Sequence, residues 1–157
     1  MSTLVELIKK GTLVKYEPLL ADFETEERII YMIGSAKKYF DMTILPMLPS
    51  KKGNTTPAQQ CYAIMDKYCS GEPMNGRFFA LLEPQGEGIF KLKNGDIRII
   101  GWEQTPSCFI VASFNLRENL ARRSSKINKN IRNKSQYNKQ RVAAKVQRLK
   151  LNLITSG

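Results

Sequence analysis

Alternating apolar and polar residues make residues 88–115 the most strongly patterned part of the chain. Two β-type runs lie within it, GIFKLK and DIRIIGW, and they meet at Asn94-Gly95, a dipeptide that favours the tight turn of a β-hairpin. A third run, CFIVASF, follows a turn marked by Pro106. The pattern therefore predicts three consecutive antiparallel strands.

The alternation gives the predicted sheet two different faces. Apolar residues recur through the first two runs, namely Ile89, Leu92, Ile97, Ile99 and Trp102. Between them stand Lys91, Lys93 and Arg98. Because successive side chains of a strand point to opposite faces, one face can pack while the other carries cations. We take the cationic face as the candidate working surface.

Two helices are predicted before the sheet. In residues 24–40, apolar side chains recur at helical spacing, and acids in the first turn oppose lysines near the end. Residues 44–54 form a loop with two prolines and a glycine. Thr56 then has the features of an N-cap, Pro57 suits the first helical position, and Gln59 can complete a capping box. We expect these two helices to form a hairpin over the sheet.

Shorter runs complete the N-terminal part. Residues 4–10 suggest a short helix and residues 12–16 a strand. Residues 78–82, FFALL, are a fourth strand candidate that precedes the three-strand run. The prediction is an α+β fold, in which the helical hairpin packs on a twisted antiparallel sheet of three to four strands.

The last quarter of the chain has a different character. Residues 118–134 are polar and basic, and they suggest either a loose basic helix or a mobile loop. Residues 135–154 predict a C-terminal helix with its apolar positions at Val142, Val146, Leu149 and Leu153. Length and composition favour a single domain over residues 1–157.

The net charge of +11 becomes informative once it is located. Residues 1–116 hold 13 Lys/Arg and 13 Asp/Glu, whereas residues 117–157 hold 12 Lys/Arg and Glu118 alone. The whole excess therefore sits in the last quarter, which points to a polyanionic partner. A solvated basic tail with no dedicated partner is the alternative.

Composition also restricts the class of protein. No run approaches the length of a membrane span, and no export signal is evident, so we expect a cytoplasmic protein without membrane contact. Three cysteines without CxxC spacing and an absence of histidine argue against a disulfide framework, a zinc site or another metal cofactor. We expect Cys61, Cys69 and Cys108 to be reduced and buried.

At this point the sequence resembles the RelE/ParE toxin superfamily, including its HigB-like members. The segments that carry the resemblance are GIFKLKNGDIRIIGW with CFIVASFNLRE, and the later NKSQYNKQRVAAKVQRLK. It covers residues 12–151 in the order of elements and is most specific over residues 88–117. It implies a toxin of a toxin–antitoxin system, with helices packed on one side of an antiparallel sheet.

The resemblance also implies a site. Ribosome-dependent RNases of this group carry lysines on the strand before the hairpin and an arginine on the next, where Lys91, Lys93 and Arg98 stand. A second arginine follows the third strand, at Arg117, and a tyrosine near the last helix corresponds to Tyr137. The segment 118–134 is longer than in the family, so Arg122 or Arg123 are alternatives to Arg117. Histidines that HigB-like members often use are absent.

These residue types suit cleavage of RNA by its own 2′-hydroxyl. Arginines neutralise charge on the phosphoryl oxygens, and a lysine acts as a base if neighbouring cations lower its pKa. The remaining cations of the basic segment are expected to contact phosphates of mRNA and ribosomal RNA. They are Arg122, Arg123, Lys126, Lys129, Arg132 and Lys134. A small antitoxin protein would be the inhibitor.

Simpler interpretations stand beside these. The strand cations can form an ordinary solvated face that pairs with Asp96 and Glu103. Tyr137 can be a packing residue, and Trp102 and Phe114 are expected in the core. Other functional classes also remain: a gyrase-directed toxin of the same fold, a non-catalytic protein that binds nucleic acid, or a mobile-element protein that blocks a host factor.

Overall fold

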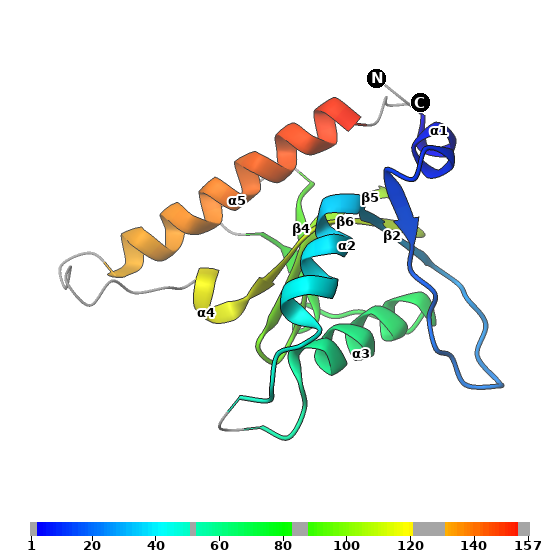
Figure 1. Ribbon diagram of the computed structural model, residues 1–157, viewed down its shortest axis with the longest axis horizontal. Helices are drawn as coiled ribbons and strands as arrows, with labels where there is room; N and C mark the ends of the chain where they lie inside the picture. The colour runs from blue at the N-terminus through cyan, green and yellow to red at the C-terminus, as the bar shows by residue number, and fades with distance from the viewer. Residues whose placement is uncertain (1–2, 51–52, 83–87, 121–130, 154–157) are drawn as a thin grey trace.

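The computed structural model describes residues 3–50, 53–82, 88–120 and 131–153, with side chains omitted at 119–120 and 131–140. The protein has an α+β fold built on one mixed sheet of six strands in the order β1-β2-β6-β5-β4-β3 (Figure 1). The strands are β1 (Leu13–Lys15), β2 (Ile29–Ile33), β3 (Phe79–Leu81), β4 (Phe90–Asn94), β5 (Ile97–Thr105) and β6 (Cys108–Leu116).

The helices lie before, between and after these strands. They are α1 (Leu4–Lys9), α2 (Gly34–Tyr39) with its π-helical continuation η1 (Phe40–Ile44), α3 (Pro57–Cys69), α4 (Arg117–Leu120) and α5 (Ile131–Leu153). The predicted capping box of α3 is confirmed. The Thr56 hydroxyl accepts a hydrogen bond from the Gln59 backbone, and the Gln59 side chain accepts one from the Thr56 N–H.

The predicted helix over residues 24–40 is wrong in its first half. Residues Ile29–Ile33 form β2, which runs parallel to β6 and antiparallel to β1, and the helix begins only at Gly34. A strand buried between two neighbours has a continuous apolar sequence, and a short apolar run does not distinguish such a strand from a buried helix. The β-branched Ile29, Ile30 and Ile33 were the signal for a strand.

The sheet is correspondingly larger than predicted. The antiparallel succession of β3, β4, β5 and β6 is present as expected. However, β2 and β1 extend it beyond β6, and the parallel β2–β6 pair makes it mixed. The two helices do pack together, since the rings of Phe40 in η1 and Tyr62 in α3 meet edge to face with centroids 5.4 Å apart. The C-terminal helix begins at Ile131, inside the predicted basic insertion.

The sheet is covered on both faces. One face meets α3 and η1: Tyr68 contacts Phe109, and Phe40 contacts Phe114. Trp102 and Ile110 point to the other face and are fully buried, and α5 covers that face with its buried Ala143 and Val146. In the view of Figure 1, α5 lies above the sheet and α3 below it.

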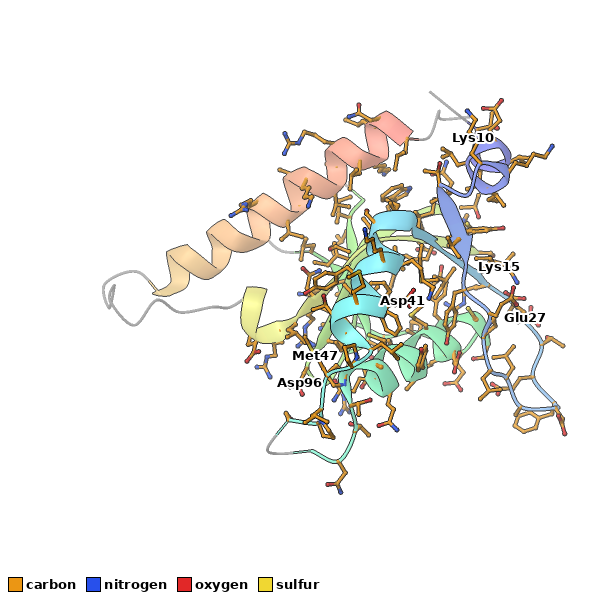
Figure 2. The ribbon with its side chains drawn as sticks, viewed as in Figure 1. Lys10, Lys15, Glu27, Asp41, Met47 and Asp96 are labelled. Carbon is orange, nitrogen blue, oxygen red and sulfur yellow. The ribbon has the colours of Figure 1, made fainter. Side chains whose placement is uncertain are left out.

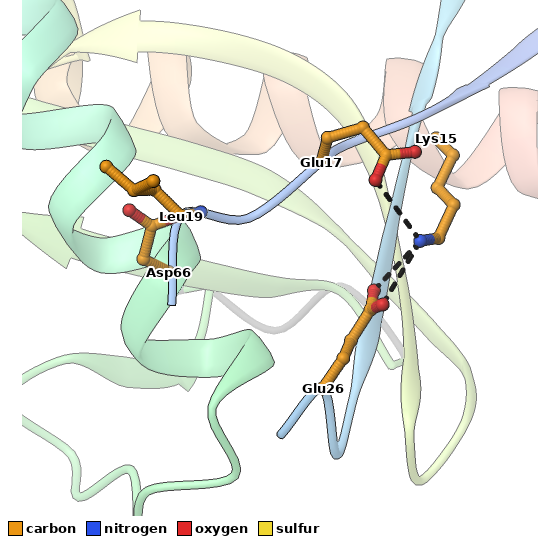
Figure 3. Close-up of polar contacts among 5 residues, drawn as sticks. All are labelled: Lys15, Glu17, Leu19, Glu26 and Asp66. Carbon is orange, nitrogen blue, oxygen red and sulfur yellow. Dashed lines mark hydrogen bonds and ion pairs between the residues drawn. The ribbon is translucent and has the colours of Figure 1, made fainter. Parts of the chain in front are cut away.

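Polar contacts fasten the N-terminal strand and the loop that follows it (Figure 3). The Lys15 ammonium lies 3.7 Å from a Glu17 carboxylate oxygen and 3.1 Å from one of Glu26. The Leu19 N–H donates to the Asp66 carboxylate of α3 at 3.1 Å. These contacts hold the edge of the sheet against α3, at the opposite end of the molecule from the β4–β5 hairpin tip (Figure 2).

Candidate functional site

The β4–β5 hairpin brings three of the predicted site residues together. In its register Lys93 stands opposite Arg98, and Lys91 stands opposite Ile100. Residues directly opposite each other in an antiparallel pair project from the same face. Lys91 and Lys93, two positions apart on β4, therefore share one face with Arg98 of β5. This is the face that α5 covers, and all three side chains are partly buried. The predicted separation of a packed face from a cationic face is therefore wrong, because the buried Ile100 and Trp102 lie on the same face as these cations.

The tip of this hairpin is anchored on α3 by Gln60. Its side-chain oxygen accepts a hydrogen bond from the Asp96 N–H at 2.9 Å, and its backbone oxygen accepts one from the Asn94 amide at 3.0 Å. Gly95 has a φ of +53°, and a Cβ there would lie 2.9 Å from the Gln60 side chain. The turn therefore requires a glycine for both conformation and space.

The Arg98 guanidinium is oriented by the turn beside it. Its Nη1 donates to the backbone oxygens of Gly95 at 2.9 Å and Ile97 at 2.8 Å. Burial lowers the pKa of Arg98, the charge of Arg117 lowers it further, and Asp96 acts in the opposite sense. Arg98 stays protonated, because a guanidinium does not deprotonate in proteins. A bound anion would therefore relieve repulsion between Arg98 and Arg117.

Arg117 lies just beyond β6, where its backbone N–H donates to the Asp96 oxygen at 2.7 Å. Its side chain is exposed and borders a hollow of about 510 Å³. The other lining residues are Met47, Leu48, Ser50, Pro57, Asp96, Leu116 and Glu118. Figure 2 labels Met47 and Asp96 at this end of the molecule. Lys93 and Arg98 begin a row of polar side chains that runs across the sheet. Arg117 lies beside this row, at the hairpin end of the site.

That row continues onto β6. Asn115 stands opposite Arg98, and its amide donates to the Ser113 hydroxyl at 2.8 Å and to the Arg98 backbone oxygen at 3.4 Å. The sequence prediction did not include Asn115 or Ser113 in the site. Their alternation with Phe114 in the run ASFN was the available signal that the two share a face, and the register with β5 makes it the face of Arg98.

Helix α5 adds a second line of cations. Arg141, Lys145 and Arg148 are exposed and spaced i, i+4 and i+7, so they follow one side of the helix opposite Ala143 and Val146. The Lys150 ammonium approaches Gly88, where an added Cβ would lie 3.1 Å from it. The described half of this helix therefore has a cationic surface.

Ordinary ion pairs do not account for three of these cations. Among the described side chains, the ion pairs join Lys15, Lys37 and Lys67 to carboxylates, and none uses Lys93, Arg98 or Arg117. The predicted ion pairing of the strand cations with Asp96 and Glu103 is thus not found for Lys93 and Arg98. Glu103 instead accepts a hydrogen bond from the Tyr68 hydroxyl at 3.1 Å.

Several predicted site residues cannot be compared with the structure. Tyr137, Arg132 and Lys134 belong to the first turns of α5, where side chains are not described. The others lie outside the described residues and are Arg122, Arg123, Lys126 and Lys129. Their roles stay predictions.

The residues expected to be structural are buried. Trp102 and Phe114 lie in the core, as predicted. All three cysteines are unpaired and buried, and burial raises the pKa of Cys61 and of Cys69 to about 12. Among the residues described, no three His, Cys, Asp or Glu side chains gather in a way that could hold a metal ion.

None of the helices in the described ranges combines the length and the apolar character that a membrane span requires. Comparison of the chain with models of protein families, with curated proteins and with solved structures finds no match. The site must therefore be interpreted from its own geometry.

Proposed function

We propose that the protein is an endoribonuclease akin to the toxins of the RelE/ParE superfamily, one that cleaves translated mRNA on the ribosome. The observation that carries the proposal is the shared face of Lys91, Lys93 and Arg98, with Arg117 near enough for its charge to lower the Arg98 pKa. Cations gathered in this way, three of them partly buried, form a site suited to a phosphodiester.

The order of elements supports the same proposal. Apart from α1, β2 and α4, the chain forms a strand (β1), two helices (α2 with η1, and α3), four consecutive antiparallel strands and a basic terminal helix (α5). This is the order on which the resemblance to the superfamily rests. Strand β2, which stands between β1 and α2, and the short helix α4 are additions to that arrangement.

The residues have separate tasks in the proposed reaction. A lysine, Lys91 or Lys93, accepts the proton of the 2′-hydroxyl while the 2′-oxygen attacks the adjacent phosphorus. The bond from phosphorus to the 5′-oxygen breaks, leaving a 2′,3′-cyclic phosphate and, after proton transfer to the leaving oxygen, a 5′-hydroxyl. Arg98 and Arg117 stabilise the charge that develops on the phosphoryl oxygens. Among the described residues, Arg98 donates to the turn through Nη1, and its remaining N–H donors are proposed to bind the phosphate.

The proposal includes partners and a place of action. Ribosomal RNA would meet the cations of α5, and Tyr137 would approach the message from the same helix. A small antitoxin would inhibit the protein by covering the cationic face with an acidic or apolar segment. Translated message places the reaction in the cytoplasm, and the chemistry requires no metal or other cofactor.

Induced expression followed by mapping of mRNA 5′ ends tests the proposal. We expect cuts within translated frames for the wild type, and a strong reduction for Lys91→Ala or Lys93→Ala. Lys10→Ala is the control, because Lys10 lies at the end of α1, far from Asp96 (Figure 2). Intact message with halted replication would point instead to a gyrase-directed toxin. RNA that is bound but never cut would indicate a binding protein without catalysis.

A further inference from the structure

A notch in the surface opens beside Lys93, Arg98 and Asn115, at the point where β2 stops pairing with β6. Strand β2 pairs with β6 only as far as Met32 and Val111, and the chain then turns into α2. Beyond that point α2 lies beside β6 in place of a strand. The result is a cavity of about 360 Å³, near the lower end of the ~300–1,000 Å³ typical of small-molecule sites. Its lining consists of Ser35, Ala36, Tyr39, Ala112, Ser113, Phe114, Asn115 and Lys145.

The lining combines an aromatic ring with hydrogen-bonding groups. The Tyr39 side chain is 38% exposed and borders the notch. The Asn115 amide already donates to the Ser113 hydroxyl, which leaves the Asn115 side-chain oxygen as an acceptor and the Ser113 O–H as a donor. An adjacent donor and acceptor match the edge of a nucleobase, and a tyrosine ring offers a stacking surface. Lys145 adds a cation to the lining.

The notch is continuous with the proposed catalytic residues Lys93 and Arg98. Asn115 is the direct neighbour of Arg98 across the β5–β6 pair, and Arg98 is the neighbour of Lys93 across β4–β5. Adjacent strands lie about 5 Å apart. A phosphate held at Arg98 would therefore leave the attached nucleoside within reach of Asn115 and Tyr39.

We infer that this notch is a base-binding subsite, which takes one unstacked RNA base next to the phosphate that is cleaved. Tyr39 stacks on the base, Ser113 and Asn115 read its edge, and Lys145 contacts the adjoining phosphate. The inference rests on the proposed function. It makes Ser113 and Asn115 specificity residues, so the protein prefers one base at the position beside the cut.

Binding of uncleavable RNA tests this subsite apart from catalysis. The probes are four fluorescent single-stranded RNA hexamers, 2′-O-methylated throughout and differing in one central base, measured by fluorescence anisotropy. We expect Tyr39→Ala to weaken binding about 5- to 150-fold, the range for loss of one stacked base. Tyr39→Phe restores binding because it keeps the ring. Asn115→Ala reduces the spread of affinities among the four hexamers.

Tyr62→Ala is the matched control, because Tyr62 is 39% exposed but lies on α3, outside the notch. It should bind within about twofold of the wild type, and thermal melting checks that each variant folds. A folded Tyr39→Ala that binds like the wild type overturns the subsite. If that variant also cleaves mRNA normally, the nuclease proposal survives and only the subsite fails. A wild type that neither binds the hexamers nor cuts mRNA overturns both.

Discussion

At the scale of single residues, the site depends on how closely β5 and β6 approach each other. Gly101 marks the closest contact: a Cβ there would lie 1.9 Å from the Ile110 backbone oxygen. The register of β5 against β6 shifts at the same place, since Ile100 pairs with Ser113 and Gly101 with Val111. The extra residue on β6 is a bulge, which places Ser113 and Asn115 on the face of Arg98.

Gly101→Ala should therefore lower the free energy of unfolding by about 3 kcal/mol or more, because backbone atoms must move to admit the methyl group. Denaturant unfolding measures the loss. Gly76→Ala is the control: nothing lies within 4 Å of the point that its methyl group would occupy, so a change within about 0.5 kcal/mol is expected. Equal stability of the two variants would contradict the close approach of the strands.

At the scale of elements, the hairpin and α3 act as one unit through Gln60. Its side chain binds the Asp96 N–H and also donates to the Thr55 hydroxyl at 3.2 Å. The adjacent Gln59 serves a different purpose, since it closes the capping box at Thr56. Neighbouring glutamines of one helix thus have separable roles.

Gln60→Ala should cost about 1–2 kcal/mol of stability and slow RNA cleavage, because the turn that orients Arg98 loses its anchor. Gln59→Ala should cost about 1 kcal/mol through the lost cap and leave the cleavage rate unchanged once folding is matched. Cleavage assays at a temperature where both variants are fully folded separate the effects. Identical rates for the two variants would show that the hairpin does not need this anchor.

The elements also show what the sequence could and could not predict. The β4–β5 hairpin and the start of α3 were predictable because Asn94-Gly95 and the Thr56 capping box are local signals. Strand β2 had only its β-branched isoleucines as a local signal, and its identity is decided by pairing with β6, a partner that lies far along the chain. The notch was hidden for the same reason, since it exists only where that pairing stops.

At the scale of the whole molecule, charge is distributed unevenly. The net charge of +11 arises entirely from residues 117–157, and Arg141, Lys145 and Arg148 display part of it along α5. That helix covers the same face of the sheet that carries Lys93 and Arg98. Lys145 also lines the notch with Ser113 and Asn115, so an RNA strand that extends from the site into the notch would meet this cation of α5.

RNA affinity should fall steeply with salt, and the slope reports the number of phosphates neutralised. Replacing Arg141, Lys145 and Arg148 by Gln should reduce the slope of log K against log salt by about 2, at about 0.7 per lost contact on a single strand. The control replaces Lys9, Lys10 and Lys38 by Gln. These three exposed lysines lie outside α5, and their replacement removes the same amount of charge. If both triple variants change the slope equally, net charge alone governs binding.

The cleavage rate of Arg98→Ala tests the central claim most directly. It is measured in single turnover on purified ribosomes that are translating a defined mRNA, after thermal melting has shown that the variant is folded. Under the proposal that Arg98 stabilises charge on the scissile phosphate, we predict a rate about 10²–10³ times slower than the wild type, with Lys10→Ala unchanged. A folded Arg98→Ala that cuts the message as fast as the wild type would contradict the account.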